Sequence, residues 1–161
     1  MSQAIYNIWK SIFPNDLRHL RPHRWRQLKS LITSRGFHKV LEFGSGVSTL
    51  LFESLGLQVT SYETDNVYME KVKSLSNGNT TFHLWNNFIP TPPITDIYGL
   101  SLVDGANPRD IQLTYAITHS VFVAIDDYRY DDKLRFEPLM SSYKRLDDRS
   151  TPLAIFKVKY V

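Results

Sequence analysis

Hydrophobic residues along the chain form short apolar runs that alternate with longer segments of helical periodicity. Runs with the length and composition of β-strands lie at 39–43, 57–62, 80–85, 100–103, 121–125 and 153–160. Apolar residues recur at helical spacing at 22–35, 49–55, 65–75, 108–118 and 132–145. This repeated strand-helix order predicts an α/β fold, in which helices cover both faces of an open, mostly parallel sheet.

The chain length of 161 residues is typical of one domain. We expect a single domain with an N-terminal helical segment at 1–36 and an α/β core at 37–161. The final strand candidate has no second strand beside it in the sequence, which predicts a C-terminal sheet edge that is abbreviated. A second copy of the chain could cover that edge, so a homodimer is a further expectation.

A glycine-bearing turn, Gly44-Ser45-Gly46, separates the first predicted strand from the helix after it. Glycines there allow a tight bend and a close approach of a ligand to the backbone, although a plain turn also uses them. A dinucleotide-binding fingerprint would carry a third glycine where Thr49 stands. Glu42 beside the turn would repel a pyrophosphate and attract an ammonium group, which favours S-adenosylmethionine over a nicotinamide cofactor.

Acidic residues follow the later predicted strands. Glu63 lies about twenty residues after the turn, where a carboxylate of this architecture accepts hydrogen bonds from ribose hydroxyls; alternatively, it is an exposed residue near a helix start. Asp104, Asp126 and Asp127 end two further strands, and a parallel sheet would bring them to the same rim as the turn. Their oxygens suit Mg²⁺ or Ca²⁺, whereas the alternative is a turn residue and a helix cap.

Four motifs together resemble those of class I S-adenosylmethionine-dependent methyltransferases: LEFGSGVST at 41–49, SYETD at 61–65, LVDGA at 102–106 and AIDDY at 124–128. The resemblance spans about residues 37–130 and implies a seven-stranded Rossmann-like sheet. It implies that the cofactor is bound by Glu42, Gly44, Ser45, Gly46, Ser48, Thr49, Glu63, Trp85, Asn86 and Asp104. Trp85 and Asn86 would lie near the adenine, although Trp85 is equally compatible with a place in the core.

The chain is also similar to metal-dependent O-methyltransferases of the catechol and macrocin types. That likeness implies a small-molecule hydroxyl as methyl acceptor, and a divalent ion such as Mg²⁺ held by Asp104, Asp126 and Asp127. Without a metal, Asp104 or Asp127 is the candidate general base, with His83 and His119 as alternatives that no neighbouring residue singles out. The alternatives are an NAD(P)-dependent oxidoreductase on the same fold, and a catalytically silent module that binds a cofactor or nucleic acid.

Composition excludes only a few of these possible functions. The formal net charge is +3, and basic residues gather at 18–29, either as a patch for an anionic partner such as nucleic acid or as a solvated helix face over a buried Trp25. The absence of cysteine excludes disulfides and a thiol nucleophile. No apolar run is long enough to span a bilayer and no secretory signal is visible, so we expect no membrane partner and a cytoplasmic location.

Overall fold

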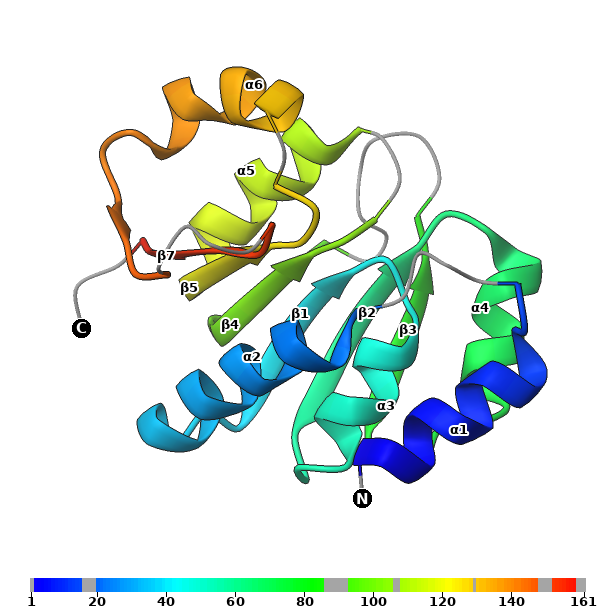
Figure 1. Ribbon diagram of the computed structural model, residues 1–161. Helices are drawn as coiled ribbons and strands as arrows, with labels where there is room; N and C mark the ends of the chain where they lie inside the picture. Colours follow the sequence, from blue (N-terminus) through cyan, green and yellow to red (C-terminus); the bar gives the residue numbers. More distant parts are fainter. Residues whose placement is uncertain are drawn as a thin grey trace.

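The computed structural model describes residues 2–15, 20–85, 93–105, 108–128, 130–147 and 152–158. It shows one seven-stranded sheet with helices on both sides (Figure 1). The helices are α1 (Ser2–Ile12), α2 (Pro22–Arg35), α3 (Val47–Glu53), α4 (Asn66–Lys73), α5 (Arg109–His119) and α6 (Tyr130–Met140). The strands are β1 (Lys39–Phe43), β2 (Gln58–Glu63), β3 (Thr80–Leu84), β4 (Tyr98–Val103), β5 (Ser120–Ile125), β6 (Lys144–Arg145) and β7 (Ala154–Lys157).

The strands are arranged in the order β3-β2-β1-β4-β5-β7-β6. The first five of these run parallel to one another, while β7 pairs antiparallel with both β5 and β6. Phe43 at the end of β1 lies opposite Val103, which in turn lies opposite Ile125. The carboxyl ends of the central strands are therefore level, and the prediction of a mostly parallel, Rossmann-like α/β fold is confirmed.

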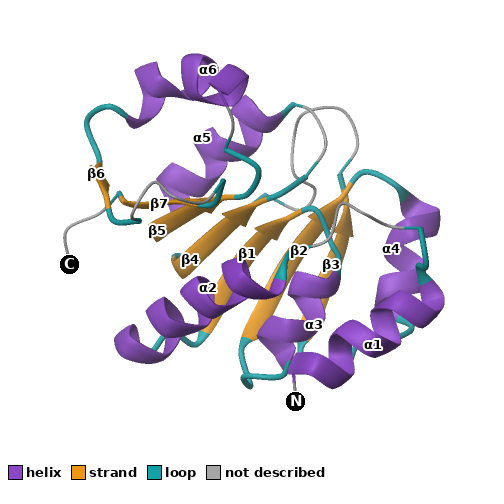
Figure 2. Ribbon diagram, in the orientation of Figure 1, coloured by secondary structure: helices purple, strands orange, loops and turns teal. Residues whose placement is uncertain are grey.

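Alternating strand residues bury the two faces of the sheet under different helices (Figure 2). In β5, Phe122 and Ala124 join the cluster beneath α1, α2 and α3, whereas Val123 and Ile125 join the cluster beneath α5 and α6. Strands that are buried on both faces explain the near-continuous apolar runs of the sequence.

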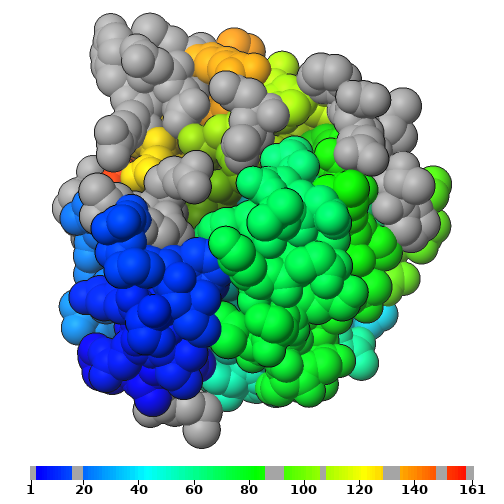
Figure 3. All heavy atoms as spheres, turned by 90° about the vertical axis from the view of Figure 1, so that its right-hand side faces the viewer, coloured from blue at the N-terminus to red at the C-terminus, as the bar shows by residue number. Residues whose placement is uncertain are grey.

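The N-terminal segment is part of this packing. Tyr6 and Trp9 of α1 are buried, and Trp9 contacts Tyr68 of α4 edge to face at a centroid distance of 6.1 Å. Figure 3 shows the blue N-terminal helix lying against the green surface around α4. None of the described helices is long and apolar enough to cross a membrane.

The C-terminal edge differs from the sequence prediction. The last helix ends at Met140 instead of 145, because Ser141-Ser142-Tyr143 is a poor helix continuation and forms a turn. The next two residues become β6, which pairs with β7, and Asp147 fixes Arg145 through hydrogen bonds of 2.7 to 3.0 Å. The sequence predicts no strand beside the last one, so β6 is an addition to the predicted strands, and with β6 the sheet has seven strands.

Candidate functional site

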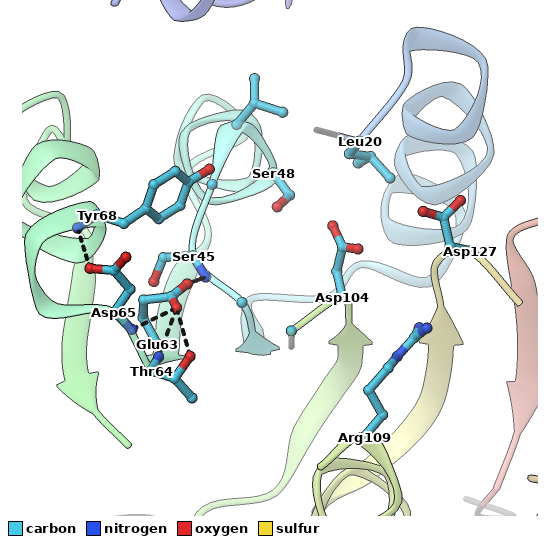
Figure 4. A pocket seen from close by; sticks show the side chains of 14 residues that line it. Leu20, Ser45, Ser48, Glu63, Thr64, Asp65, Tyr68, Asp104, Arg109 and Asp127 are labelled. Carbon is cyan, nitrogen blue, oxygen red and sulfur yellow. Dashed lines mark hydrogen bonds between the residues drawn. The ribbon is translucent and has the colours of Figure 1, made fainter. Parts of the chain in front are cut away.

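A cavity of about 540 Å³ opens at the carboxyl ends of β1 and β4. In the sheet, β1 lies between β2 on one side and β4 on the other, so the strand order reverses at β1. The cavity lies at this point of reversal, where open α/β sheets usually bind their ligands. Figure 4 shows its side chains. Its lining consists of Leu20, Gly44, Ser45, Gly46, Val47, Ser48, Glu63, Thr64, Asp65, Tyr68, Asp104, Gly105, Arg109 and Asp127.

The two glycines of the turn have different roles. Gly44 has a φ of +95°, and a Cβ at this position would lie 2.7 Å from the Cα of Gly105, which only glycine avoids. Gly46 is extended, and a Cβ there would meet nothing closer than the Tyr68 hydroxyl at 3.8 Å. Gly44 thus allows the backbone after β1 to pack closely against the backbone after β4. The missing side chain of Gly46 instead leaves space inside the cavity.

Glu42 lies beneath the turn and not on the cavity wall. Its fully buried carboxylate accepts hydrogen bonds from Ser48 Oγ at 2.6 Å, Thr49 Oγ1 at 2.5 Å and Ser61 Oγ at 2.8 Å. Burial raises the pKa of Glu42 to about 7, although these three hydroxyls favour the ionised form. The structure therefore gives Glu42 and Thr49 a supporting position under the turn, while Ser48 also reaches the cavity wall.

Glu63 is fixed on the cavity wall at the end of β2. Its Oε2 atom accepts a hydrogen bond from the Ser45 amide at 3.0 Å, and its Oε1 atom accepts from the amides of Thr64 at 2.7 Å and Asp65 at 3.0 Å (Figure 4). Asp65 in turn caps α4 by accepting from the Tyr68 amide at 3.0 Å. The carboxylate of Glu63 is thereby tied to the glycine turn itself.

Asp104 follows β4 and turns its carboxylate into the centre of the cavity (Figure 4). Its environment raises the pKa of Asp104 well above the usual range, first through burial and then through the charge of Asp126, while Arg109 opposes the shift. Within the part of the chain that the structure describes, no hydrogen bond or ion pair satisfies this carboxylate. Asp104 is thus placed to meet a cationic or hydrogen-donating ligand.

Asp126 and Asp127 share a cation from a distant helix. Nη1 of Arg24 lies 2.7 Å from Oδ1 of Asp126 and 2.9 Å from Oδ1 of Asp127. Arg24 and Asp126 are buried, while Asp127 is 41% exposed and lines the cavity. The backbone of Asp127 has a φ of +51°. Burial would lower the pKa of Arg24, but the two carboxylates raise it above its ordinary value.

Arg24, which pairs with two of the predicted site carboxylates, was not predicted as a site residue. Trp25 is buried as expected, but the interpretation of Arg24 as part of a solvated helix face is wrong. Leu28 and Ile32 follow Arg24 at four-residue intervals and are buried with it, so the spacing itself placed Arg24 on the apolar face. That spacing was the available signal.

Arg109 closes the cavity from the helix after Asp104. Its Nη2 atom donates to the carbonyl oxygens of Val103, at 3.2 Å, and Asp126. Its guanidinium also lies 5.9 Å from the ring centroid of Phe136. Arg109 therefore braces the ends of β4 and β5 while it adds a positive charge to the acidic side of the cavity.

Trp85, one of the two residues predicted near an adenine, does not line the cavity. Trp85 is buried in the hydrophobic cluster beneath α5 and α6, with its ring 5.3 Å from that of Phe43 and 6.4 Å from that of Tyr62. This is the core position that the sequence left open as an alternative. Asn86 lies outside the described residues.

The carboxylates after β4 and β5 do not fit a divalent ion as they are placed. Two of the three are already bonded to Arg24, and no three acidic, histidine or cysteine side chains among the described residues are grouped to hold a metal. The Mg²⁺ site at Asp104, Asp126 and Asp127 stays a prediction.

The sequence matches no protein-family profile and no curated protein. Solved structures do match. The O-methyltransferase TomG from Streptomyces achromogenes, solved in complex with SAM, has a TM-score of 0.76 at 17% identity, covering 98% of this chain and 90% of that one. An O-methyltransferase from Bacillus cereus in complex with SAH has a TM-score of 0.73 at 13% identity, over 97% and 90% of the two chains.

A methyltransferase-like protein from Silicibacter pomeroyi is more similar in sequence, at 23% identity, with a TM-score of 0.62 over 87% of each chain. Identities in this range establish shared architecture but not shared chemistry. The chain therefore has the Rossmann-like fold of these methyltransferases.

Proposed function

We propose that the protein is an S-adenosylmethionine-dependent methyltransferase that acts on a hydroxyl group of a small molecule. The fold is shared with TomG, solved with SAM, and with the Bacillus cereus enzyme, solved with SAH. The observation that carries the proposal is the carboxylate of Glu63, which is bonded to the Ser45 amide of the glycine turn at the edge of a 540 Å³ cavity.

Glu63 suits a ribose. Among the described residues, the Oε2 atom of Glu63 accepts one hydrogen bond, from the Ser45 amide, and a carboxylate oxygen can accept a second. A ribose presents two neighbouring hydroxyl donors, and a carboxylate held by three backbone amides meets them without reorganisation. The space beside Gly46 would then admit the rest of the nucleoside along the turn.

The charge of the cavity favours the methyl donor over a dinucleotide. Carboxylates of Glu63, Asp65, Asp104 and Asp127 line it, against the guanidinium of Arg109. A pyrophosphate would be repelled by this wall, whereas the sulfonium and ammonium groups of S-adenosylmethionine would be attracted. Asp104, whose carboxylate has no partner among the described residues, is our candidate for the ammonium or for the acceptor hydroxyl.

Methyl transfer needs little from the protein beyond alignment and a proton acceptor. The acceptor oxygen forms a bond to the methyl carbon, the carbon–sulfur bond breaks, and sulfur keeps the electron pair as S-adenosylhomocysteine is released. The hydroxyl proton passes to a carboxylate, for which Asp104 and Asp127 are the candidates. Burial raises the pKa of Asp104, which makes its ionised carboxylate a stronger proton acceptor than an ordinary aspartate.

Other expectations remain predictions. A homodimer at the β6 edge and a cytoplasmic location are consistent with the fold, and neither is needed for the proposed chemistry. A nucleic-acid partner loses part of its support, because buried Arg24 cannot contribute to a surface patch.

Isothermal titration with S-adenosylhomocysteine, S-adenosylmethionine and NAD tests the proposal. We expect the first two to bind and NAD not to bind at comparable concentrations. Glu63→Gln should weaken S-adenosylhomocysteine binding roughly 10- to 100-fold, as expected for loss of a hydrogen bond to a charged group. Glu70→Gln, an exposed change on α4, is the matched control and should bind as the wild type does. Failure of both methionine-derived ligands to bind at millimolar concentration would refute the proposal.

A further inference from the structure

We propose that the guanidinium of Arg24 takes the place of a divalent cation at the acidic end of the cavity, so that Arg24 is a positioning residue for Asp126 and Asp127. The inference rests on the proposed function only in assuming that the methyl acceptor binds at this acidic end of the cavity. It differs from the metal site that the sequence resemblance implies, because the carboxylates of Asp126 and Asp127 are already bonded to Arg24.

The first support is geometric. A single nitrogen, Nη1 of Arg24, bridges Oδ1 of Asp126 at 2.7 Å and Oδ1 of Asp127 at 2.9 Å. A bridging divalent ion would join the same two carboxylates. Because the nitrogen already lies between them, an ion could bind both oxygens only after the guanidinium had moved away.

The second support is that Arg24 cannot move away easily. Its side chain is 6% exposed, and the next residue, Trp25, is buried and packs edge to face against Phe52 at a centroid distance of 5.7 Å. Ahead of the helix, buried Leu20 is fixed because its carbonyl oxygen accepts from the Tyr6 hydroxyl at 2.7 Å. Displacing the guanidinium would leave a buried Asp126 without its counterion, which is costly.

The third support concerns the rest of the possible donor set. Arg109 donates to the carbonyl oxygen of Asp126, which is thereby engaged from the other side. Two guanidinium groups, from Arg24 and Arg109, thus face the three carboxylates of Asp104, Asp126 and Asp127. The residual negative charge is small, so the attraction for a further cation of charge two is much reduced.

The arrangement assigns a specific task to Arg24. Asp126 is 1% exposed and anchors the guanidinium, while Asp127 is 41% exposed and lines the cavity. Arg24 therefore restrains the Asp127 carboxylate at the cavity wall through the Oδ1 atom of Asp127. If Arg24 takes the place of the metal ion, removal of divalent ions by a chelator should not abolish methyl transfer.

Binding of Mn²⁺ alone, measured by the electron paramagnetic resonance signal of the free ion, tests the proposal without requiring catalysis. Wild-type protein should show no site that fills at 1 mM Mn²⁺ or below, on the order of the weakest specific sites. Arg24→Ala should bind Mn²⁺ at least tenfold more tightly than the wild type, because the carboxylates of Asp126 and Asp127 lose their shared counterion. Arg24→Lys should remain close to wild type, and Arg26→Ala, an exposed change on the same helix, should match it.

The outcomes separate cleanly. Micromolar Mn²⁺ binding by the wild type that Asp126→Asn abolishes would overturn the inference, whether or not the Arg24 variants fold. A folded Arg24→Ala protein that gains no Mn²⁺ binding would also overturn it, and folding is checked by circular dichroism. Titration of the same wild-type sample with S-adenosylhomocysteine tests the proposed function separately, because binding of that ligand does not require a metal ion.

Discussion

The two sides of the cavity keep their carboxylates in place by different means. On the turn side, Glu63 is bonded to the amides of Ser45, Thr64 and Asp65, all within 18 residues of it in the chain. On the acidic side, Asp126 is bonded to Arg24, which is 102 residues away. One side is therefore built from the backbone of a local motif, and the other depends on a helix docked from the opposite end of the chain.

This difference affects what each side contributes. Backbone amides are present whatever the side chains are, so the turn side depends on backbone conformation and on glycine. The acidic side depends on the identity of a few charged residues and on burial, which makes every missing partner expensive. Substitutions that separate backbone effects from charge effects can test the comparison.

The largest effect is expected from the turn. Gly44→Ala should prevent native folding or destabilise the protein severely, because its Cβ would lie 2.7 Å from the backbone of Gly105 at a φ of +95°. Gly46→Ala should change the free energy of unfolding by no more than about 1 kcal/mol, since its Cβ meets no atom within 3.8 Å. The same change should weaken S-adenosylhomocysteine binding at least tenfold. Urea unfolding and calorimetric titration measure both, and equal loss of stability in the two variants would contradict this division of roles.

The next effect concerns the buried charges. Arg24→Met should lower the free energy of unfolding by about 3 to 5 kcal/mol, because it leaves buried Asp126 without a counterion. Combining it with Asp126→Asn should cost clearly less than the sum of the two single changes. Chemical unfolding of the four proteins of this cycle gives the coupling, and strict additivity would show that the ion pair is not the stabilising contact.

The smallest effect is a pH dependence that originates under the turn. Folding raises the pKa of Glu42 from 4.5 to about 7, so the folded state binds this proton more tightly than the unfolded chain does. The contribution of Glu42 is therefore fully present below pH 4.5 and is lost as pH rises through 7, by on the order of 3 kcal/mol. Glu42→Gln should remove this part of the decline in unfolding free energy.

Urea unfolding between pH 5 and 8 checks that expectation. A smaller decline should remain in the variant, because burial also raises the pKa of Asp104 and Asp126. Wild-type stability that increases over this range, or an unchanged slope in the variant, would contradict the assigned environment of Glu42.

The sequence predicted the strands best where both faces are buried. Strand β1 has the predicted bounds of 39–43, and α2 begins and ends as predicted, since Pro22 and Gly36 mark its limits chemically. Prediction was weaker at the C-terminal edge. Residues 144 and 145 form a strand there because β7 lies beside them, and no local pattern of two residues signals such pairing.

Prediction within the site divides in the same way. The glycine turn and Glu63 were identified because their spacing in the chain fixes their relation across two adjacent parallel strands. The orientation of Glu42 was not predicted, because a carboxylate at a strand end can face a ligand or the underside of the turn. In the structure, Glu42 faces the underside of the turn, because three hydroxyl groups donate to it there, one of them from Ser61 on the neighbouring strand.

The sequence by itself determined the alternating fold, the turn at 44–46 and the rim on which its acidic residues would gather. These follow from periodicity and from the short-range conformational demands of glycine and proline, which act within a few residues. Only the tertiary structure decided that Arg24 lies between Asp126 and Asp127, because burial and charge pairing depend on which helix packs above which strand. That choice is made by the whole core, where α2 lies on the sheet through Trp25 and Leu28.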